Sequence, residues 1–262
     1  MMLPINGNYL NVADTGPRDA PVLVFANSLG TDFRLWDAVL ANLPENYRII
    51  RYDKRGHGLS GGPEGPYFMG DLVSDLAKIL DTLELKNVVL VGLSIGGMIA
   101  QGLAAERPDL LKAAVFSNTG AKIGTPQMWE ERASAIKTGG IEALEVGILE
   151  RWFSESFRTS RKAELSYWRN MLCRTWVHGY LGCAAAIAET DLFDSTARLR
   201  LPVLGIAGSE DGSTPPDMVR ELTEIVPGAD YHLIRGAGHL PCVENPGEYA
   251  RVLVQFLAKI GH

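Results

Sequence analysis

Short apolar runs alternate along the chain with longer segments in which apolar residues recur at helical spacing. The run Val88-Val89-Leu90-Val91 is continuous and mostly β-branched, as expected for a strand buried on both faces. Between residues 68 and 83 the apolar positions instead follow the period of a helix. The pattern predicts strands at residues 8–13, 22–26, 47–52, 88–91, 112–116, 202–207 and 230–234, and helices at residues 36–43, 68–83, 98–106 and 249–260.

This alternation predicts an α/β fold with a mostly parallel sheet covered by helices on both faces. Residues 121–198 interrupt it, because they contain no strand pattern and are helical in character, starting with a favourable helix start at Thr125-Pro126. Ligands of such sheets bind outside the carboxyl ends of the strands. We therefore expect a core of residues 1–120 and 199–262, and an all-helical lid of residues 121–198 that walls a pocket at the strand ends.

Composition and charge narrow the class of protein. Of the 262 residues, 46% are hydrophobic and 21% are charged, which is ordinary for a globular protein. A net charge of −6 without any basic run argues against a nucleic-acid binder. No stretch has the length of a membrane span, and the amino terminus lacks the positive and apolar regions of a signal peptide. Since Cys173, Cys183 and Cys242 have no metal-like spacing, we expect reduced thiols in a cytoplasmic protein that binds neither nucleic acid nor membrane.

The pentapeptide Gly92-Leu93-Ser94-Ile95-Gly96 lies between a predicted strand and a predicted helix. A Gly-x-Ser-x-Gly at such a corner is typical of the nucleophile elbow of α/β-hydrolases, in which the turn lifts the serine hydroxyl clear of the sheet. Any Cβ at the flanking glycines would collide with the neighbouring strand and helix. The context therefore predicts an α/β-hydrolase fold with Ser94 as the nucleophile.

A serine nucleophile needs a base and an orienting acid, which in this fold follow it in the order acid, then histidine. Of the five histidines, only His239 follows a predicted strand and lies in a glycine-rich loop, whereas His57 precedes the serine and is expected to brace a loop. Asp211 is the predicted acid, because Gly-x-x-Asp after the strand at residues 202–207 is the usual arrangement. Its neighbour Glu210 is read as a solvated acid. An acid after the preceding strand would lie near Asn118, which cannot carry a negative charge.

The oxyanion of the tetrahedral intermediate needs hydrogen-bond donors. One is expected to be the backbone N–H of Ile95, the residue after the nucleophile, and the other the backbone N–H of Leu29 in the loop after the strand at residues 22–26. Many hydrolases carry His-Gly in that loop, where this chain has Asn27-Ser28. This difference in side chains does not remove the backbone N–H of Leu29.

Beyond these generic motifs, the chain resembles the 3-oxoadipate enol-lactone hydrolases of bacterial aromatic catabolism over nearly its whole length. The segments that carry the resemblance are residues 27–32, 51–58, 92–97, 118–126 and 150–153. The resemblance implies hydrolysis of a small, anionic, unsaturated lactone to 3-oxoadipate in the β-ketoadipate pathway, without a metal or an organic cofactor.

A lactone that bears a carboxylate needs a cationic partner where it is desolvated. Arg132 is the candidate, because it lies on one helical face with Trp129, which would supply an apolar wall. The alternative is that Arg132 is simply a solvated charge of the helix surface, beside Glu130 and Glu131.

Rival functions share the fold and the three catalytic residue types. They are a general carboxylesterase, a perhydrolase-type haloperoxidase and a carbon–carbon bond hydrolase. A dehalogenase is disfavoured, because its nucleophile would be an aspartate where Ser94 stands. A non-catalytic ligand receptor could dispense with the serine, the acid and the histidine, which this chain keeps.

Overall fold

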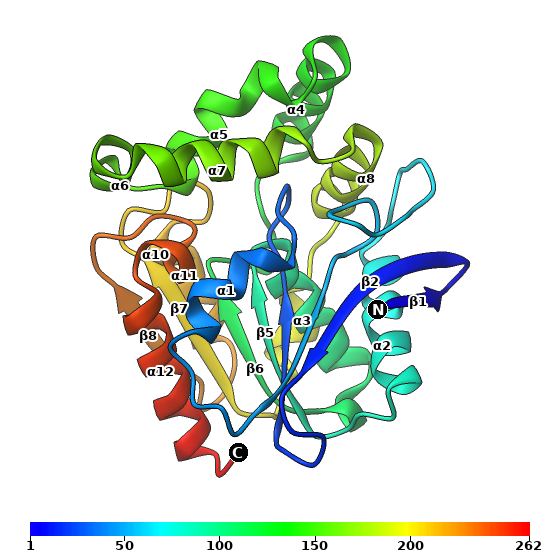
Figure 1. Cartoon of the computed structure of the whole chain (residues 1–262), viewed down its shortest axis with the longest axis vertical. Helices are drawn as coiled ribbons and strands as arrows, with labels where there is room; N and C mark the ends of the chain where they lie inside the picture. The colour runs from blue at the N-terminus through cyan, green and yellow to red at the C-terminus, as the bar shows by residue number, and fades with distance from the viewer.

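The computed structural model describes residues 1–262, with eight strands in one sheet (Figure 1). The strands are β1 (Met2–Ile5), β2 (Asn8–Thr15), β3 (Val22–Ala26), β4 (Arg48–Tyr52), β5 (Val88–Leu93), β6 (Leu111–Ser117), β7 (Val203–Gly208) and β8 (Asp230–Ile234). Their order in the sheet is β1-β2-β4-β3-β5-β6-β7-β8. The pairs β1–β2 and β2–β4 are antiparallel and all other neighbours are parallel, so the predicted mostly parallel sheet is confirmed.

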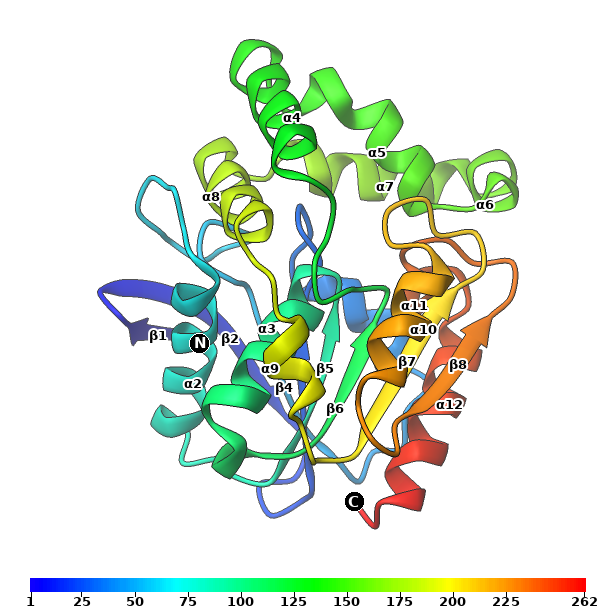
Figure 2. The same cartoon turned by 180° about the vertical axis from the view of Figure 1, so that it is seen from behind.

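Helices cover both faces of the sheet, as predicted. On one face α1 (Asp37–Leu40) packs against α12 (Pro246–Lys259) (Figure 1). The other face is covered by α2 (Met69–Thr82), α3 (Ile95–Glu106), α9 (Phe193–Ala197) and α10 (Pro216–Glu224) (Figure 2). Shorter elements are η1 (Phe33–Trp36), η2 (Pro108–Leu110) and α11 (Pro241–Glu244). None of the helices combines the length and the apolar character needed to cross a membrane.

A strand and a helix are the clearest departures from the predicted pattern. The strand β1 was not predicted, and it forms a hairpin with β2 through Asn6 and Gly7, both at positive φ. It is short, at the edge of the sheet, and contains Pro4, which a sheet tolerates only at such an edge. The helix predicted at residues 36–43 is instead the 3₁₀ turn η1 followed by the single turn α1. It begins earlier because the Asp32 side chain caps the N–H of Arg34.

The order of the strands brings the loops of interest together. The chain moves from β3 to β4 on one side and then returns to place β5 on the other side of β3. In this register Ala26 of β3 lies beside Gly92 of β5. The loops that follow β3 and β5 therefore meet at a topological switch point, where open α/β sheets bind their ligands.

The segment predicted as a lid contains only helices. They are α4 (Pro126–Gly139), η3 (Ile141–Leu144), α5 (Glu145–Trp152), α6 (Glu155–Ser160), α7 (Lys162–Cys173), α8 (Val177–Ala188) and α9. Helices α4 to α8 lie over the carboxyl ends of the parallel strands, whereas α9 packs against α3 beside the sheet (Figures 1 and 2). The division into core and lid remains a prediction, and α9 is the part of residues 121–198 that packs with the core.

Helix α8 lies in backbone contact with loops of the core. A Cβ on Gly179 would come within 2.1 Å of the carbonyl oxygen of Gly56, in the loop after β4. A Cβ on Gly65 would similarly lie 2.7 Å from Cα of Gly182. Real Cβ atoms do not approach so closely, so glycine at these positions lets α8 rest directly on the core.

Candidate active site

Ser94 occupies the corner between β5 and α3, with φ of 59° and ψ of −120°. A positive φ is uncommon for a residue with a side chain and marks local strain. A Cβ on Gly92 would lie 2.1 Å from the carbonyl oxygen of Gly96, and a Cβ on Gly96 would lie 2.2 Å from that of Ala26. The expected need for glycine at both positions is therefore confirmed. The corner is held against β6, because the N–H of Ser94 donates to the carbonyl oxygen of Ser117 at 3.0 Å.

Asp211 and His239 lie side by side at the ends of β7 and β8. Nδ1 of His239 is 2.9 Å from Oδ2 of Asp211, and both side chains are buried. A carboxylate can only accept, so the imidazole proton lies on Nδ1, which leaves Nε2 as the ring nitrogen able to take a proton. Glu210, the neighbour of Asp211, is exposed.

Several donors surround the Asp211 carboxylate. Oδ1 accepts from the N–H groups of Ser213 and Thr214, at 2.7 and 2.9 Å, and the Thr214 hydroxyl donates to Oδ2 at 2.7 Å. Burial by itself would raise the pKa of Asp211. The charge and hydrogen bond of His239, with the donors from Asn118 and Thr214, hold that pKa below its usual value.

The sequence marks Asn118 as a place where an acid would be expected and as the first residue of a segment that carries the resemblance. It follows β6 at a φ of 44°, and its Nδ2 donates to Oδ2 of Asp211 at 2.8 Å. Its Oδ1 accepts from the Ser117 hydroxyl, which orients the amide. The position thus supplies a donor to the Asp211 carboxylate, a contact that sequence reasoning missed.

Glu244 of α11 is a second residue that sequence reasoning missed. Its Oε1 accepts from the N–H of Gly238, the residue before His239, at 2.7 Å, and its Oε2 accepts from the Ser154 hydroxyl at 2.5 Å. Burial raises the pKa of Glu244. This carboxyl group ties the histidine loop to the chain that follows α5.

The two predicted oxyanion donors follow adjacent strands, Leu29 in the loop after β3 and Ile95 at the start of α3 after β5. The N–H of Leu29 donates to no protein group, and Ile95 is the first residue of α3, so it has no carbonyl one turn earlier to donate to. Leu29 and Ser94 line the same cavity. The two N–H groups therefore have the freedom that an oxyanion hole requires.

A cavity of about 360 Å³ lies between the core and helices α4, α5 and α8. Ser28, Leu29, Ser94, Thr214 and His239 line it from the core. Trp129, Arg132, Ile148, Arg151, Trp152, Tyr180 and Ile187 are among the residues that line it from the lid segment. The structure thus brings the side chains of Ser94, His239, Trp129 and Arg132, and the loop of Leu29, to one cavity. Asp211 does not line this cavity and reaches it through its hydrogen bond to His239.

Two arginines and one glutamate, Glu131, line this cavity, and neither arginine forms an ion pair. Arg132 of α4 lies over the Trp129 ring, with Cζ 5.0 Å from the ring centroid, as their shared helical face predicts. Trp129 is buried, and its indole N–H donates to the carbonyl oxygen of Ile123 at 2.7 Å. Arg151 of α5 forms no hydrogen bond or ion pair through its side chain, and burial together with the charge of Arg132 lowers its pKa. Arg151 was marked in the sequence only as part of the run 150–153 that carried the resemblance.

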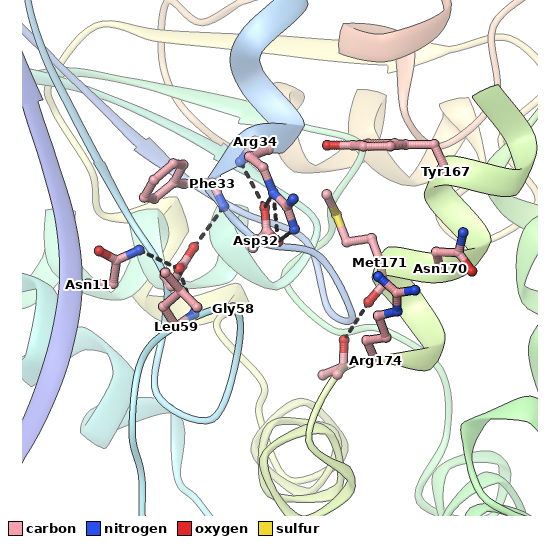
Figure 3. Close-up of a pocket in the computed structure, with 12 residues that line it drawn as sticks. Asn11, Asp32, Phe33, Arg34, Gly58, Leu59, Tyr167, Asn170, Met171 and Arg174 are labelled. Carbon is pink, nitrogen blue, oxygen red and sulfur yellow. Dashed lines mark hydrogen bonds and ion pairs between the residues drawn. The ribbon is translucent and has the colours of Figure 1, made fainter. Parts of the chain in front are cut away.

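A neighbouring groove shows that not every arginine near the site is free in this way. It has a volume of about 380 Å³ and is lined by residues such as Arg34, Tyr167 and Arg174 (Figure 3). Arg34 is paired with Asp32 through both carboxylate oxygens, with its Nε 3.0 Å from Oδ1 (Figure 3). Arg34 is therefore ion-paired within the protein, whereas Arg132 and Arg151 are not.

No group of three or more histidine, cysteine, aspartate or glutamate side chains is placed to hold a metal ion. Cys173 lies on α7, Cys183 on α8 and Cys242 on α11, and all three are free thiols. Burial raises the pKa of Cys183 and of Cys173 to about 12. These thiols remain protonated at neutral pH. Cys183 is buried, whereas Cys173 is half-buried and donates to Oε2 of Glu145.

Comparisons with known proteins agree with the geometry. The model of the alpha/beta hydrolase family matches residues 23–252. Two 3-oxoadipate enol-lactonases of Acinetobacter baylyi are similar to the chain, one 34% identical over 90% of this chain and 88% of that protein, the other 32% identical over 97% and 95%. The crystal structure of the enol-lactonase from Burkholderia xenovorans superimposes with a TM-score of 0.95 at 34% identity, covering 98% of this chain and 100% of that one. The chain is therefore a hydrolase that belongs to the alpha/beta hydrolase family, and the resemblance to the enol-lactonases that its motifs indicated is confirmed.

Proposed function

We propose that the protein opens the lactone ring of 3-oxoadipate enol-lactone to give 3-oxoadipate, as a cytoplasmic step of bacterial aromatic catabolism. The observation that carries the proposal is the pair of uncompensated arginines, Arg132 and Arg151, in a small cavity that also holds Ser94 and His239. Both arginines are half-buried, and a cation that is partly removed from water without a partner is unfavourable unless a ligand supplies the anion. The names of the relatives and the three free thiols are consistent with this reaction and its compartment.

Catalysis begins with the attack of Ser94 Oγ on the lactone carbonyl carbon, while Nε2 of His239 takes the hydroxyl proton. Asp211 holds the imidazole and stabilises its positive charge. The N–H groups of Leu29 and Ile95 stabilise the oxyanion. When the intermediate collapses, the ring C–O bond breaks and the leaving enolate takes the proton from Nε2 of His239, which returns the imidazole to its neutral form. The resulting enol then tautomerises to the ketone of 3-oxoadipate.

The acyl group is then bound to Ser94 as an ester. A water molecule gives one proton to His239 and attacks this ester carbonyl, and the same two N–H groups stabilise the second oxyanion. Collapse releases the carboxylate product and returns the proton to Ser94. Arg132 and Arg151 bind the carboxylate that the substrate already carries, and Trp129 forms part of the apolar wall.

A substrate panel tests the proposal directly. With 3-oxoadipate enol-lactone, an unsubstituted saturated lactone and p-nitrophenyl acetate, we expect kcat/KM to be at least about 100-fold higher for the enol-lactone, the combined size of two charged hydrogen-bonded contacts. Formation of 3-oxoadipate is measured by chromatography. A kcat/KM for the enol-lactone no higher than that for the neutral ester would refute the assignment and favour a general esterase.

Removing the arginines should affect only the anionic substrate. We expect Arg132→Ala to raise KM for the enol-lactone about 10-fold or more, and Arg151→Gln to do the same, because each loses one charge-assisted contact. Hydrolysis of p-nitrophenyl acetate should change by less than about two-fold in either variant, since that substrate carries no carboxylate.

The matched control is Arg34→Ala, which removes an arginine of the neighbouring groove that is already paired with Asp32. It should leave both substrates unaffected. Equal losses on both substrates in the Arg132 and Arg151 variants would indicate damage to α4 or α5 instead of lost recognition, and no loss on either would make these arginines surface charges.

A further inference from the structure

The Leu29 N–H belongs to the same peptide unit as the carbonyl group of Ser28. The two groups of a trans peptide point in opposite directions, so whatever binds the carbonyl oxygen also orients the N–H. The Ser28 oxygen accepts three hydrogen bonds, from Nζ of Lys54 at 2.6 Å and from the hydroxyl and N–H of Thr31 at 2.9 and 3.3 Å. The strongest of these donors is the ammonium group, because charge-assisted hydrogen bonds are about twice as strong as neutral ones.

Lys54 is an unusual donor, because it is buried and has no carboxylate partner. Only 2% of the residue is exposed, and its other contact is the carbonyl oxygen of Thr31 at 3.4 Å. Asp53 and Asp32 are the acids whose charges act on Lys54, but both are bound to other groups. Asp53 accepts hydrogen bonds from Asn11, Phe33 and Leu59. Asp32 is paired with Arg34. Cys183 and His57 are the remaining titratable groups that face it. An ammonium buried in this way destabilises the fold, so its position is not explained by packing.

The next peptide N–H along the loop is held by a second residue from the same segment. Nε2 of His57 accepts from the N–H of Gly30 at 3.1 Å, so His57 braces this loop, as expected from the sequence. Burial, and then the charge of Lys54, lowers the pKa of His57 well below its usual value, which keeps this nitrogen an acceptor. Lys54 and His57 therefore fix the peptide units on either side of Leu29 and leave its N–H free.

We propose that Lys54 is a positioning residue of the oxyanion hole, whose ammonium orients and polarises the Ser28–Leu29 peptide so that its N–H is a stronger donor to the oxyanion. This inference rests on the proposed role of Leu29 but not on the identity of the substrate. A positive charge beside the carbonyl oxygen of an amide draws electron density away from the N–H. The Lys54 ammonium is buried, so this effect is poorly screened by water. The contribution belongs to the transition state and should appear in kcat instead of KM.

Lys54→Met tests the proposal, because methionine keeps an unbranched side chain and removes the charge. We expect kcat to fall about 10- to 100-fold, on both the enol-lactone and p-nitrophenyl acetate, with KM within about three-fold of the wild type. The thermal midpoint should be no lower than that of the wild type, since a buried, unpartnered charge has been removed. Thr31→Val removes a neutral donor from the same carbonyl oxygen. It should lower kcat by a smaller factor than Lys54→Met does.

The pH profile of the wild type provides a second measurement that does not depend on a variant folding. Burial lowers the pKa of Lys54 to about 8, so kcat should decline as the pH rises through that value, and the decline should be absent from Lys54→Met. A kcat of Lys54→Met within two-fold of the wild type on both substrates, an effect confined to KM, or a wild-type kcat that stays constant to pH 9.5 would each overturn the proposal. A loss on both substrates also separates this inference from the substrate assignment, which the arginine variants test on the anionic substrate alone.

Discussion

Ser94→Ala is expected to lower kcat by about a million-fold while leaving the fold intact, because the nucleophile of a serine hydrolase is worth about that much. Alanine keeps the Cβ that Ser94 already places at a positive φ, so the strain of the corner is unchanged. Only the hydroxyl group is lost, and no structural hydrogen bond of that hydroxyl is lost with it. The expected residual rate is that of the oxyanion donors and substrate binding alone.

The experiment can be made independent of the substrate. A fluorophosphonate should label the wild-type protein once, at Ser94, and should fail to label Ser94→Ala, as measured by mass spectrometry of the intact chain. Ser213→Ala is a suitable control, because Ser213 lines the same cavity but contacts Asp211 through its backbone N–H. Near-normal turnover or labelling of Ser94→Ala, with unchanged circular dichroism, would mean that another residue is the nucleophile.

Asp211→Asn should lower kcat by about 10³- to 10⁴-fold, because an amide beside Nδ1 favours the wrong tautomer of His239. The asparagine would also face Asn118 Nδ2 and the Ser213 and Thr214 N–H groups with one oxygen fewer to accept from them. We expect some loss of thermal stability from the same cause. Steady-state kinetics with p-nitrophenyl acetate, together with a thermal melt, separates the two effects.

Glu210→Gln is the matched control for this variant, since it makes the same chemical change one residue earlier in an exposed side chain. It should remain within a few-fold of the wild type. Because the pKa of Asp211 is held below its usual value, the carboxylate stays ionised through neutral and mildly acidic pH. If kcat decreases as the pH is lowered from 7 to 5, the decrease should therefore not originate from protonation of Asp211. A larger loss of kcat in Glu210→Gln than in Asp211→Asn would identify Glu210 as the catalytic acid.

Local sequence signals were sufficient for much of the fold and for the candidate catalytic residues. The elbow was predictable because a strand, a glycine-flanked serine and a helix follow one another within a few residues. His239 and Asp211 were predictable because the fold imposes their order along the chain. The hairpin strand β1 was missed because it is short, contains a proline and is mostly exposed.

The contacts that could not be predicted join segments far apart in the sequence. Asn118 meets Asp211 only because β6 pairs with β7, which depends on the whole sheet order. Arg151 could not be placed in the cavity from its sequence, since the direction in which it points is set by how α5 packs in the lid segment. The bond of Lys54 to Ser28 likewise needs β4 to lie beside β3.

The glycine contacts beneath α8 limit how substrate can reach Ser94. With Gly179 resting on Gly56, α8 cannot slide toward the core, and any lift would break close backbone packing. Helix α5 is similarly fixed at its end, where the carbonyl oxygens of Arg151 and Trp152 accept from the N–H groups of Gly212 and Leu240. We therefore expect any opening to be a local movement of α4 and η3 and not a rotation of the whole helical segment. In such a movement Arg151 would stay with the fixed part and Arg132 would travel with α4, so the spacing of the two guanidinium groups would change.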